Sequence, residues 1–263
     1  MRLTLFLHEI RRNKLSLIIW SAAISFMLGI CIVIYPEMQS QMGEFTEMFA
    51  EMGSFSDAFG LDQINFGEFM GYFSIECGNT LGIGGAMLAA IVGISALSKE
   101  ERDHTAELLL TLPVSRNRIV TEKLLFAIFH VFAVNAVVTV VCLLGTLAIG
   151  AEANYWKMLL IFLAYFIVQI EIMAITFAIS AFIKKGGLGI GIGIAFGLYF
   201  ISIFANLSED VEFVKYITPF AIADTGRIVS EGTVDLIALL IGIAVIAASV
   251  FVAYWQYNRK DIS

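Results

Sequence analysis

The stretch SKEERDHTAELLLTLPVSRNRIVTEK, residues 98–123, lies between two apolar runs that are each long enough to cross a bilayer. It holds ten lysine, arginine, aspartate and glutamate residues, five of each sign. Ser98 followed by Glu101 matches a capping box, so we predict a helix that starts at Lys99. Pro113 should end this helix, because proline disfavours helical geometry in the residue before it. Balanced charges make a poor lipid-binding cluster, so the stretch predicts contact with another protein.

The composition of the whole chain is typical of a membrane protein. Of its 263 residues, 59% are apolar and 15% are charged, and its mean hydropathy is +0.86. Soluble domains carry about a quarter of their residues as charged side chains. The sequence therefore predicts an all-α polytopic membrane protein, with residues 1–263 forming a single transmembrane domain.

Six windows contain enough apolar residues for a helix to cross a bilayer, which takes about 20. They cover residues 15–35, 77–97, 124–149, 158–183, 187–206 and 234–257. An even number of spans places both termini on one side. The segments on that side hold thirteen lysine and arginine residues, whereas the opposite segments hold three. The positive-inside rule therefore places both termini and residues 98–123 in the cytoplasm, and residues 36–76 and 207–233 outside it.

A short amphipathic pattern precedes the first window. Leu3, Phe6, Leu7 and Ile10 recur at helical spacing among charged residues. This pattern predicts a separate interfacial helix that lies along the cytoplasmic surface. The apolar run of residues 15–35 is long for a signal peptide, so we expect it to stay attached as the first span.

Small and polar residues distinguish some of the windows. Small residues recur at intervals of four in the second window, and Gly189, Gly193 and Gly197 repeat this spacing in the fifth, which favours close helix packing. Glu171 is the one acidic residue near the middle of a window, where an ionised carboxylate is costly. Asn135 lies at a similar depth in the third window. Either Asn135 hydrogen-bonds a structural Glu171, or Glu171 handles protons or substrate.

The chain lacks the sequence motifs of intrinsic catalysis. It contains no P-loop, no HExxH, no paired-cysteine motif and no GxSxG. Its three histidines and three cysteines are too scattered to predict a metal site. We expect no catalytic residue, no metal, no cofactor bound by this chain and no nucleic-acid partner, so the energy for any transport must come from elsewhere.

Residues of the 98–123 stretch resemble the cytoplasmic coupling segment of permease subunits of type-2 ATP-binding-cassette (ABC) exporters. The resemblance rests on Glu101, Thr105, Glu107, Leu109, Leu110, Pro113, Val114, Ser115 and Arg116. His104 departs from the family pattern, which often has glycine there. The resemblance implies two separate ABC ATPase subunits, which hold ATP and Mg, and a second permease half, identical or homologous. The residues that it assigns to ATPase coupling are Glu100, Glu101, Asp103, His104, Thr105, Glu107, Leu109, Pro113 and Arg116.

The same resemblance implies further features of the fold and the function. It implies re-entrant helices between spans five and six, and it places the Gly189 stripe near the seam between two permease halves in the cytoplasmic membrane. Acid-rich outer segments with apolar stripes favour export of an amphipathic compound, such as an antimicrobial peptide or a drug, with a role in antibiotic resistance. Three alternatives remain open: a secondary transporter or channel without an ATPase, an ABC permease for ion extrusion, and an intramembrane enzyme.

Overall fold

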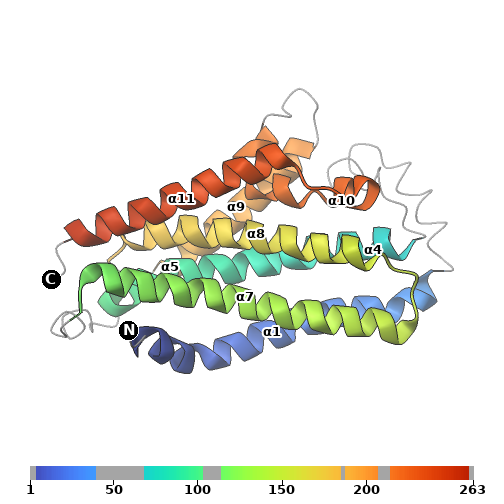
Figure 1. Ribbon diagram of the computed structural model, residues 1–263, viewed down its shortest axis with the longest axis horizontal. Coiled ribbons are helices and arrows are strands. Elements are labelled where there is room, and N and C mark those ends of the chain that lie inside the picture. Colours follow the sequence, from blue (N-terminus) through green and yellow to red (C-terminus); the bar gives the residue numbers. More distant parts are fainter. Residues whose placement is uncertain (1–3, 40–67, 103–113, 185–186, 207–213, 261–263) are drawn as a thin grey trace.

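Long helices lie side by side in a computed structural model, which describes residues 4–39, 68–102, 114–184, 187–206 and 214–260 (Figure 1). Among these residues, six helices are long and apolar enough to cross a membrane. The prediction of an all-α protein with six spans is therefore confirmed. Both ends of the chain lie at one end of the bundle. We call the end that holds Thr4 and Lys260 the terminal end, and the opposite end the distal end.

The described residues form eight α-helices and short π- and 3-10-helical segments. The α-helices are α1 (Thr4–Met38), α4 (Phe69–Asn79), α5 (Ala86–Arg102), α7 (Arg116–Ile149), α8 (Tyr155–Ser180), α9 (Leu188–Asn206), α10 (Thr225–Glu231) and α11 (Leu236–Arg259). A π-helical turn, η1 (Thr80–Gly85), joins α4 to α5, and a 3-10 helix, η3 (Pro219–Ala223), precedes α10.

The first helix differs from its prediction. A separate interfacial helix was expected before the first span, but α1 continues from Thr4 to Met38 without interruption. The residues from Ile10 to Leu15 include no proline or glycine that would end a helix. The prediction of two distinct elements is therefore wrong for the described residues, and the amphipathic turns are the first turns of the span itself.

The second span also extends beyond its predicted window. It runs from Phe69 to Glu101 through α4, η1 and α5. The predicted capping box is wrong, because Ser98 lies inside α5 rather than before a new helix. Its hydroxyl donates to the carbonyl oxygen of Ile94 at 2.7 Å. A serine that bonds back to the fourth residue before it continues a helix instead of starting one.

The core of the bundle is the contact between α5 and α8 (Figure 1). In both spans to which these helices belong, 61% of the most apolar window is buried, compared with 17% for α9 and for α11. Small residues permit this approach. A Cβ atom added to Gly93 in α5 would lie 2.4 Å from the carbonyl oxygen of Met173 and 2.2 Å from Thr176 Oγ1. Gly93 therefore faces the helix that packs most closely against α5.

The close contact between α5 and α8 predicts that one methyl group added at Gly93 lowers the stability of the fold. Gly93→Ala should lower the free energy of unfolding by about 1–3 kcal/mol, because overpacking must displace the backbone of α8. Gly29→Ala is the matched control, since a Cβ atom there meets nothing within 4 Å. The measurement is chemical unfolding of both purified variants in mixed micelles. Equal stability of the two variants would contradict the close contact between α5 and α8.

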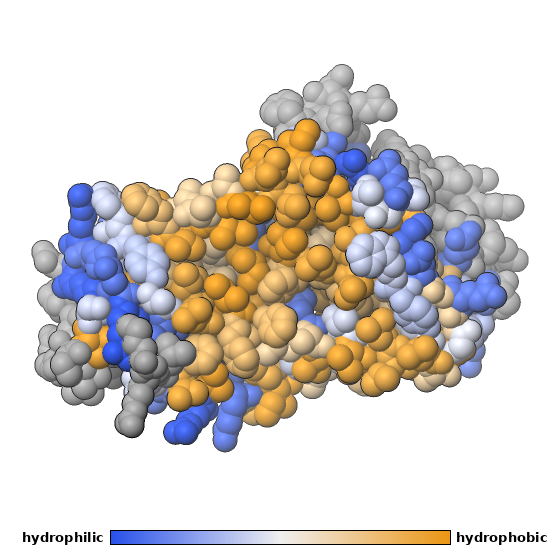
Figure 2. Space-filling view, in the orientation of Figure 1, coloured by the Kyte–Doolittle hydropathy of each residue, from blue (hydrophilic) through white to orange (hydrophobic). Residues whose placement is uncertain are grey.

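An apolar band surrounds the middle of the bundle. Figure 2 shows hydrophobic side chains over the central part of the surface and polar side chains at both ends. Large apolar side chains stay exposed within the band, including Phe26 in α1, Leu240 in α11 and Phe251 in α11, which are 69%, 67% and 70% exposed. An exposed apolar belt of this kind is expected of a surface that faces lipid or another membrane helix.

Short helices cover the distal end between α9 and α11. Asp224 caps α10 by accepting a hydrogen bond from the amide of Arg227 at 3.1 Å. Asp235 caps α11 by accepting from the amides of Ile237 and Ala238 at 2.8 and 3.1 Å. Burial alone raises the pKa of Asp235, but these amides and the neighbouring Arg227 outweigh burial and hold the pKa below its usual value. The predicted re-entrant geometry of this region remains a prediction.

Candidate functional site

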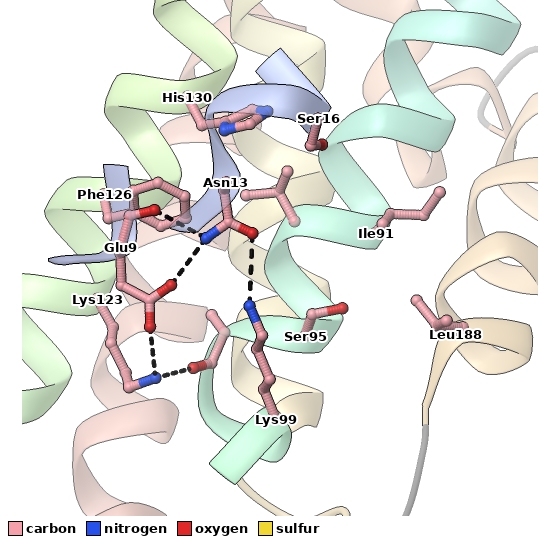
Figure 3. A pocket seen from close by; sticks show the side chains of 12 residues that line it. Glu9, Asn13, Ser16, Ile91, Ser95, Lys99, Lys123, Phe126, His130 and Leu188 are labelled. Carbon is pink, nitrogen blue, oxygen red and sulfur yellow. Dashed lines mark hydrogen bonds and ion pairs between the residues drawn. The ribbon is translucent and has the colours of Figure 1, made fainter. Parts of the chain in front are cut away.

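A cluster of charged side chains joins three helices at the terminal end. Lys123, near the start of α7, is only 3% exposed. Its ammonium group donates to the carboxylate of Glu100 and to the carbonyl oxygen of Ala96, the latter at 2.7 Å. It also lies 3.6 Å from Oε1 of Glu9 in α1. Figure 3 shows Glu9 and Lys123 facing each other. We call Glu9, Glu100 and Lys123 the Lys123 cluster, and it connects α1, α5 and α7.

A second ion pair connects the end of α5 to the C-terminal residues. Nζ of Lys260 lies 2.7 Å from Oε1 of Glu101. The same ammonium group donates to the carbonyl oxygen of Ile183, just beyond α8, at 3.1 Å. The two side chains are 5% and 12% exposed, so the pair is shielded from water. The end of α5 is thereby connected both to the end of α11 and to the link between α8 and α9.

Arg116 connects the start of α7 to the end of α11. Its Nη1 atom donates to the carbonyl oxygens of Tyr257, Asn258 and Lys260 at 3.3, 3.1 and 2.7 Å. These carbonyl groups belong to the last turn of α11 and to Lys260, which follows it, and acceptors at a helix end lack internal partners. A cation is also favoured there by the helix dipole. Arg116 therefore acts as a C-terminal cap for another helix.

Glu122 caps the N-terminus of α1, whereas Arg116 caps the C-terminus of α11. Its carboxylate accepts hydrogen bonds from the amides of Leu5 and Phe6 at 2.8 and 3.1 Å. Arg118 donates to the other carboxylate oxygen at 2.7 Å. A negative charge satisfies the free amides at a helix N-terminus and interacts favourably with its dipole. The beginning of α7 thus holds the first turn of α1 in place.

The residues predicted for coupling divide into two groups. Glu100, Glu101 and Arg116 bind other parts of the same chain, as described above. The remaining predicted coupling residues lie outside the described residues, and they are Asp103, His104, Thr105, Glu107, Leu109 and Pro113. The interactions of the first group connect the end of α5 to α7 and to Lys260, and the start of α7 to the end of α11.

Sequence reasoning missed four residues that build this end of the bundle. They are Glu9, Glu122, Lys123 and Lys260, all of which pair with residues distant in sequence. Glu122 and Lys123 stand directly before an apolar window, where an unpaired charge is costly. Their position next to an apolar window indicates that both charges need a partner, but it does not identify the partner of either residue.

A partly open cavity of about 190 Å³ lies beside the Lys123 cluster. Figure 3 shows how α1, α5 and α7 surround it. Its polar lining consists of Glu9, Asn13, Ser16, Ser95, Lys99, Lys123 and His130. Lys99 donates to Oδ1 of Asn13 at 3.4 Å, and Asn13 donates to Glu9 Oε2 at 2.8 Å. The cavity therefore has a mixed charged lining at the edge of the apolar band.

The predicted contact between Asn135 and Glu171 is wrong. Asn135 instead donates to Oε1 of Gln169 at 2.7 Å and to the carbonyl oxygen of Val131 at 2.9 Å. Gln169 and Glu171 are two positions apart on α8 and point in different directions, so Asn135 reaches only one of them. Within the described residues, Oε2 of Glu171 has no hydrogen-bond partner and lies against Gly242 of α11. A role for Glu171 in handling protons or substrate remains a prediction.

The glycine stripe of the fifth span faces away from the bundle. Cβ atoms added to Gly189, Gly193 and Gly197 would meet nothing within 4 Å. On the other face of α9, a Cβ atom added to Gly191 would lie 2.8 Å from Ile94 of α5. The helix thus has one face packed on α5 and one small-residue face that is open.

Among the described residues, no group of histidine, cysteine, aspartate and glutamate side chains is arranged to hold a metal. Cys31, Cys77 and Cys142 are free thiols.

Comparison with known proteins gives one family match. The model of the family described as ABC-2 family transporter protein matches residues 3–262, which is nearly the whole chain. A comparison with curated proteins finds no match.

Proposed function

The chain belongs to the ABC-2 transporter family, whose members are membrane components of ABC transporters, and from this premise we propose that it is the permease subunit of an exporter. In this proposal, two separate ABC ATPase subunits bind ATP and Mg at the cytoplasmic face, and a second permease half completes the pathway. The substrate class is an amphipathic compound such as an antimicrobial peptide or a drug. The terminal end faces the cytoplasm, because its segments hold most of the lysine and arginine residues.

The observation that carries this proposal is the set of ion pairs and hydrogen bonds that join the helices at the terminal end. Residues 103–113 are bounded by the end of α5 and the start of α7. Glu100 and Glu101 connect the first boundary to Lys123 and Lys260, and Arg116 connects the second boundary to the last turn of α11. A force applied to residues 103–113 by an ATPase subunit therefore reaches several spans at once. Packed helices respond to such a force by moving as rigid elements.

The open face of α9 supports pairing with a second permease half. Association of membrane helices depends on close packing of small residues. Gly189, Gly193 and Gly197 offer such a surface without obstruction from this chain. Only 17% of the α9 window is buried inside the chain, which leaves most of this helix available for a partner.

The proposal is tested by charge reversal within residues 103–113. Glu107→Lys should abolish co-purification of an ABC ATPase subunit expressed with the chain, because it places a cation where the proposed contact has an acid. Glu152→Lys is the matched control, since Glu152 is exposed in the link between α7 and α8 at the distal end. Co-purification is quantified by protein staining and by ATP hydrolysis. The proposal is wrong if Glu107→Lys retains as much ATPase subunit as Glu152→Lys.

A further inference from the structure

The cavity beside the Lys123 cluster has more hydrogen-bond donors than acceptors available to a ligand. Both oxygens of the Glu9 carboxylate already interact with this chain, Oε1 with Lys123 and Oε2 with Asn13. The Asn13 carbonyl oxygen accepts from Lys99. The donors that remain come from Lys99 and from the hydroxyl groups of the two serines in the lining, Ser16 and Ser95. A lining of this kind suits an anion better than a metal cation.

Lys99 is a cation that forms no ion pair with a carboxylate among the described residues. Its ammonium group donates a hydrogen bond to Oδ1 of Asn13 at 3.4 Å. The charged groups around it are Glu9, Glu100, Arg12 and Lys123. Among the described residues that line the cavity, Lys99 and Lys123 are cations and Glu9 is an anion. A partly buried ammonium group in such surroundings is stabilised by a bound anion.

His130 provides a second and independent observation. The residue is 1% exposed and belongs to the lining of the cavity. Its Nε2 atom has no hydrogen-bond partner within the described part of the chain. A buried polar atom normally has a partner, so this orphaned nitrogen needs one that is missing here. When the nitrogen carries a proton, it is a donor to the same space that Lys99 borders.

From these observations we propose that this cavity binds a phosphate group, held by Lys99 with help from Ser16, Ser95 and His130. The volume of about 190 Å³ is several times the roughly 30 Å³ that a water molecule occupies, so a tetrahedral oxyanion fits. The cavity lies between α1, α5 and α7, beside the Lys123 cluster at the terminal end. This is the depth at which phospholipid headgroups meet a membrane protein. A phospholipid headgroup and free phosphate share the chemistry that the site recognises.

The test uses the purified full-length chain in an uncharged detergent after removal of bound lipid. Phosphatidylglycerol and inorganic phosphate are titrated separately at constant ionic strength. Binding is followed by native mass spectrometry for the lipid and by the ligand-induced shift in Tm for both. A ligand that binds only the folded chain raises Tm, and the rise grows with the logarithm of ligand concentration above Kd. A response to phosphatidylglycerol alone identifies a lipid site, and a response to inorganic phosphate identifies a site for the free anion.

Lys99→Gln should weaken binding of the responding ligand about tenfold or more, since a charge-assisted hydrogen bond is lost. Lys14→Gln is the matched control. It removes the same charge from an exposed position near Asn13, outside the cavity lining, and should bind like the unchanged chain. Lys99→Arg keeps the cation and should keep most of the affinity, which separates binding from folding. The proposal is overturned if neither ligand responds, or if Lys99→Gln and Lys14→Gln bind equally well. This outcome does not depend on the ATPase partner.

Discussion

Replacement of Lys123 by methionine is expected to destabilise the folded chain by about 3–5 kcal/mol. Methionine keeps much of the volume of the side chain but removes its charge. The carboxylates of Glu9 and Glu100 then remain close together without their shared cation, and the carbonyl oxygen of Ala96 loses its donor. These groups are largely shielded from water, so solvent cannot replace the ammonium group. The measurement is the free energy of unfolding in mixed micelles.

Two further variants distinguish loss of the ion pairs from a non-specific loss of stability. Lys14→Met removes a lysine from an exposed position of the same end and should change stability little. Adding Glu100→Gln to Lys123→Met should recover part of the lost stability, because it neutralises one of the two carboxylates that lost the Lys123 ammonium group. A loss no larger than that of Lys14→Met would show that the Lys123 cluster contributes nothing to the fold.

The six spans were predictable because each depends on a local property of the sequence. A run of apolar residues long enough for the bilayer decides where a span lies, whatever surrounds it. The small residues of the second span were also informative, and Gly93 does face α8. The ends of the spans were less predictable. Ser98 and Glu101 match a capping box locally, but tertiary contacts keep α5 helical through Arg102.

The charged contacts could not be predicted because their partners are far apart in sequence. Nothing near Glu122 indicates that it caps α1, and nothing near Lys260 indicates Glu101 as its partner. The prediction for Asn135 failed for a related reason. Depth in the bilayer made Glu171 a candidate partner, but the direction of a side chain around a helix decides the contact, and it favours Gln169.

Glu101→Lys is expected to lower both the stability of the chain and the retention of an ABC ATPase subunit. It places two ammonium groups together where Glu101 and Lys260 now form a shielded pair. Loss of one partner of a buried pair costs about 3–5 kcal/mol. Two explanations then compete for the loss of the ATPase subunit. Either Glu101 contacts that subunit directly, as the family resemblance implies, or it acts through Lys260.

The reciprocal variant Glu101→Lys with Lys260→Glu distinguishes these explanations. It restores an ion pair of opposite polarity, but a carboxylate at position 260 cannot donate to the carbonyl oxygen of Ile183, so the free energy of unfolding should recover only in part. If Glu101 acts through Lys260, the ATPase subunit is retained again as well. Recovery of stability without recovery of the ATPase subunit would instead assign Glu101 to the subunit contact. Because the restored pair again connects the end of α5 to the end of α11, we expect both quantities to rise together.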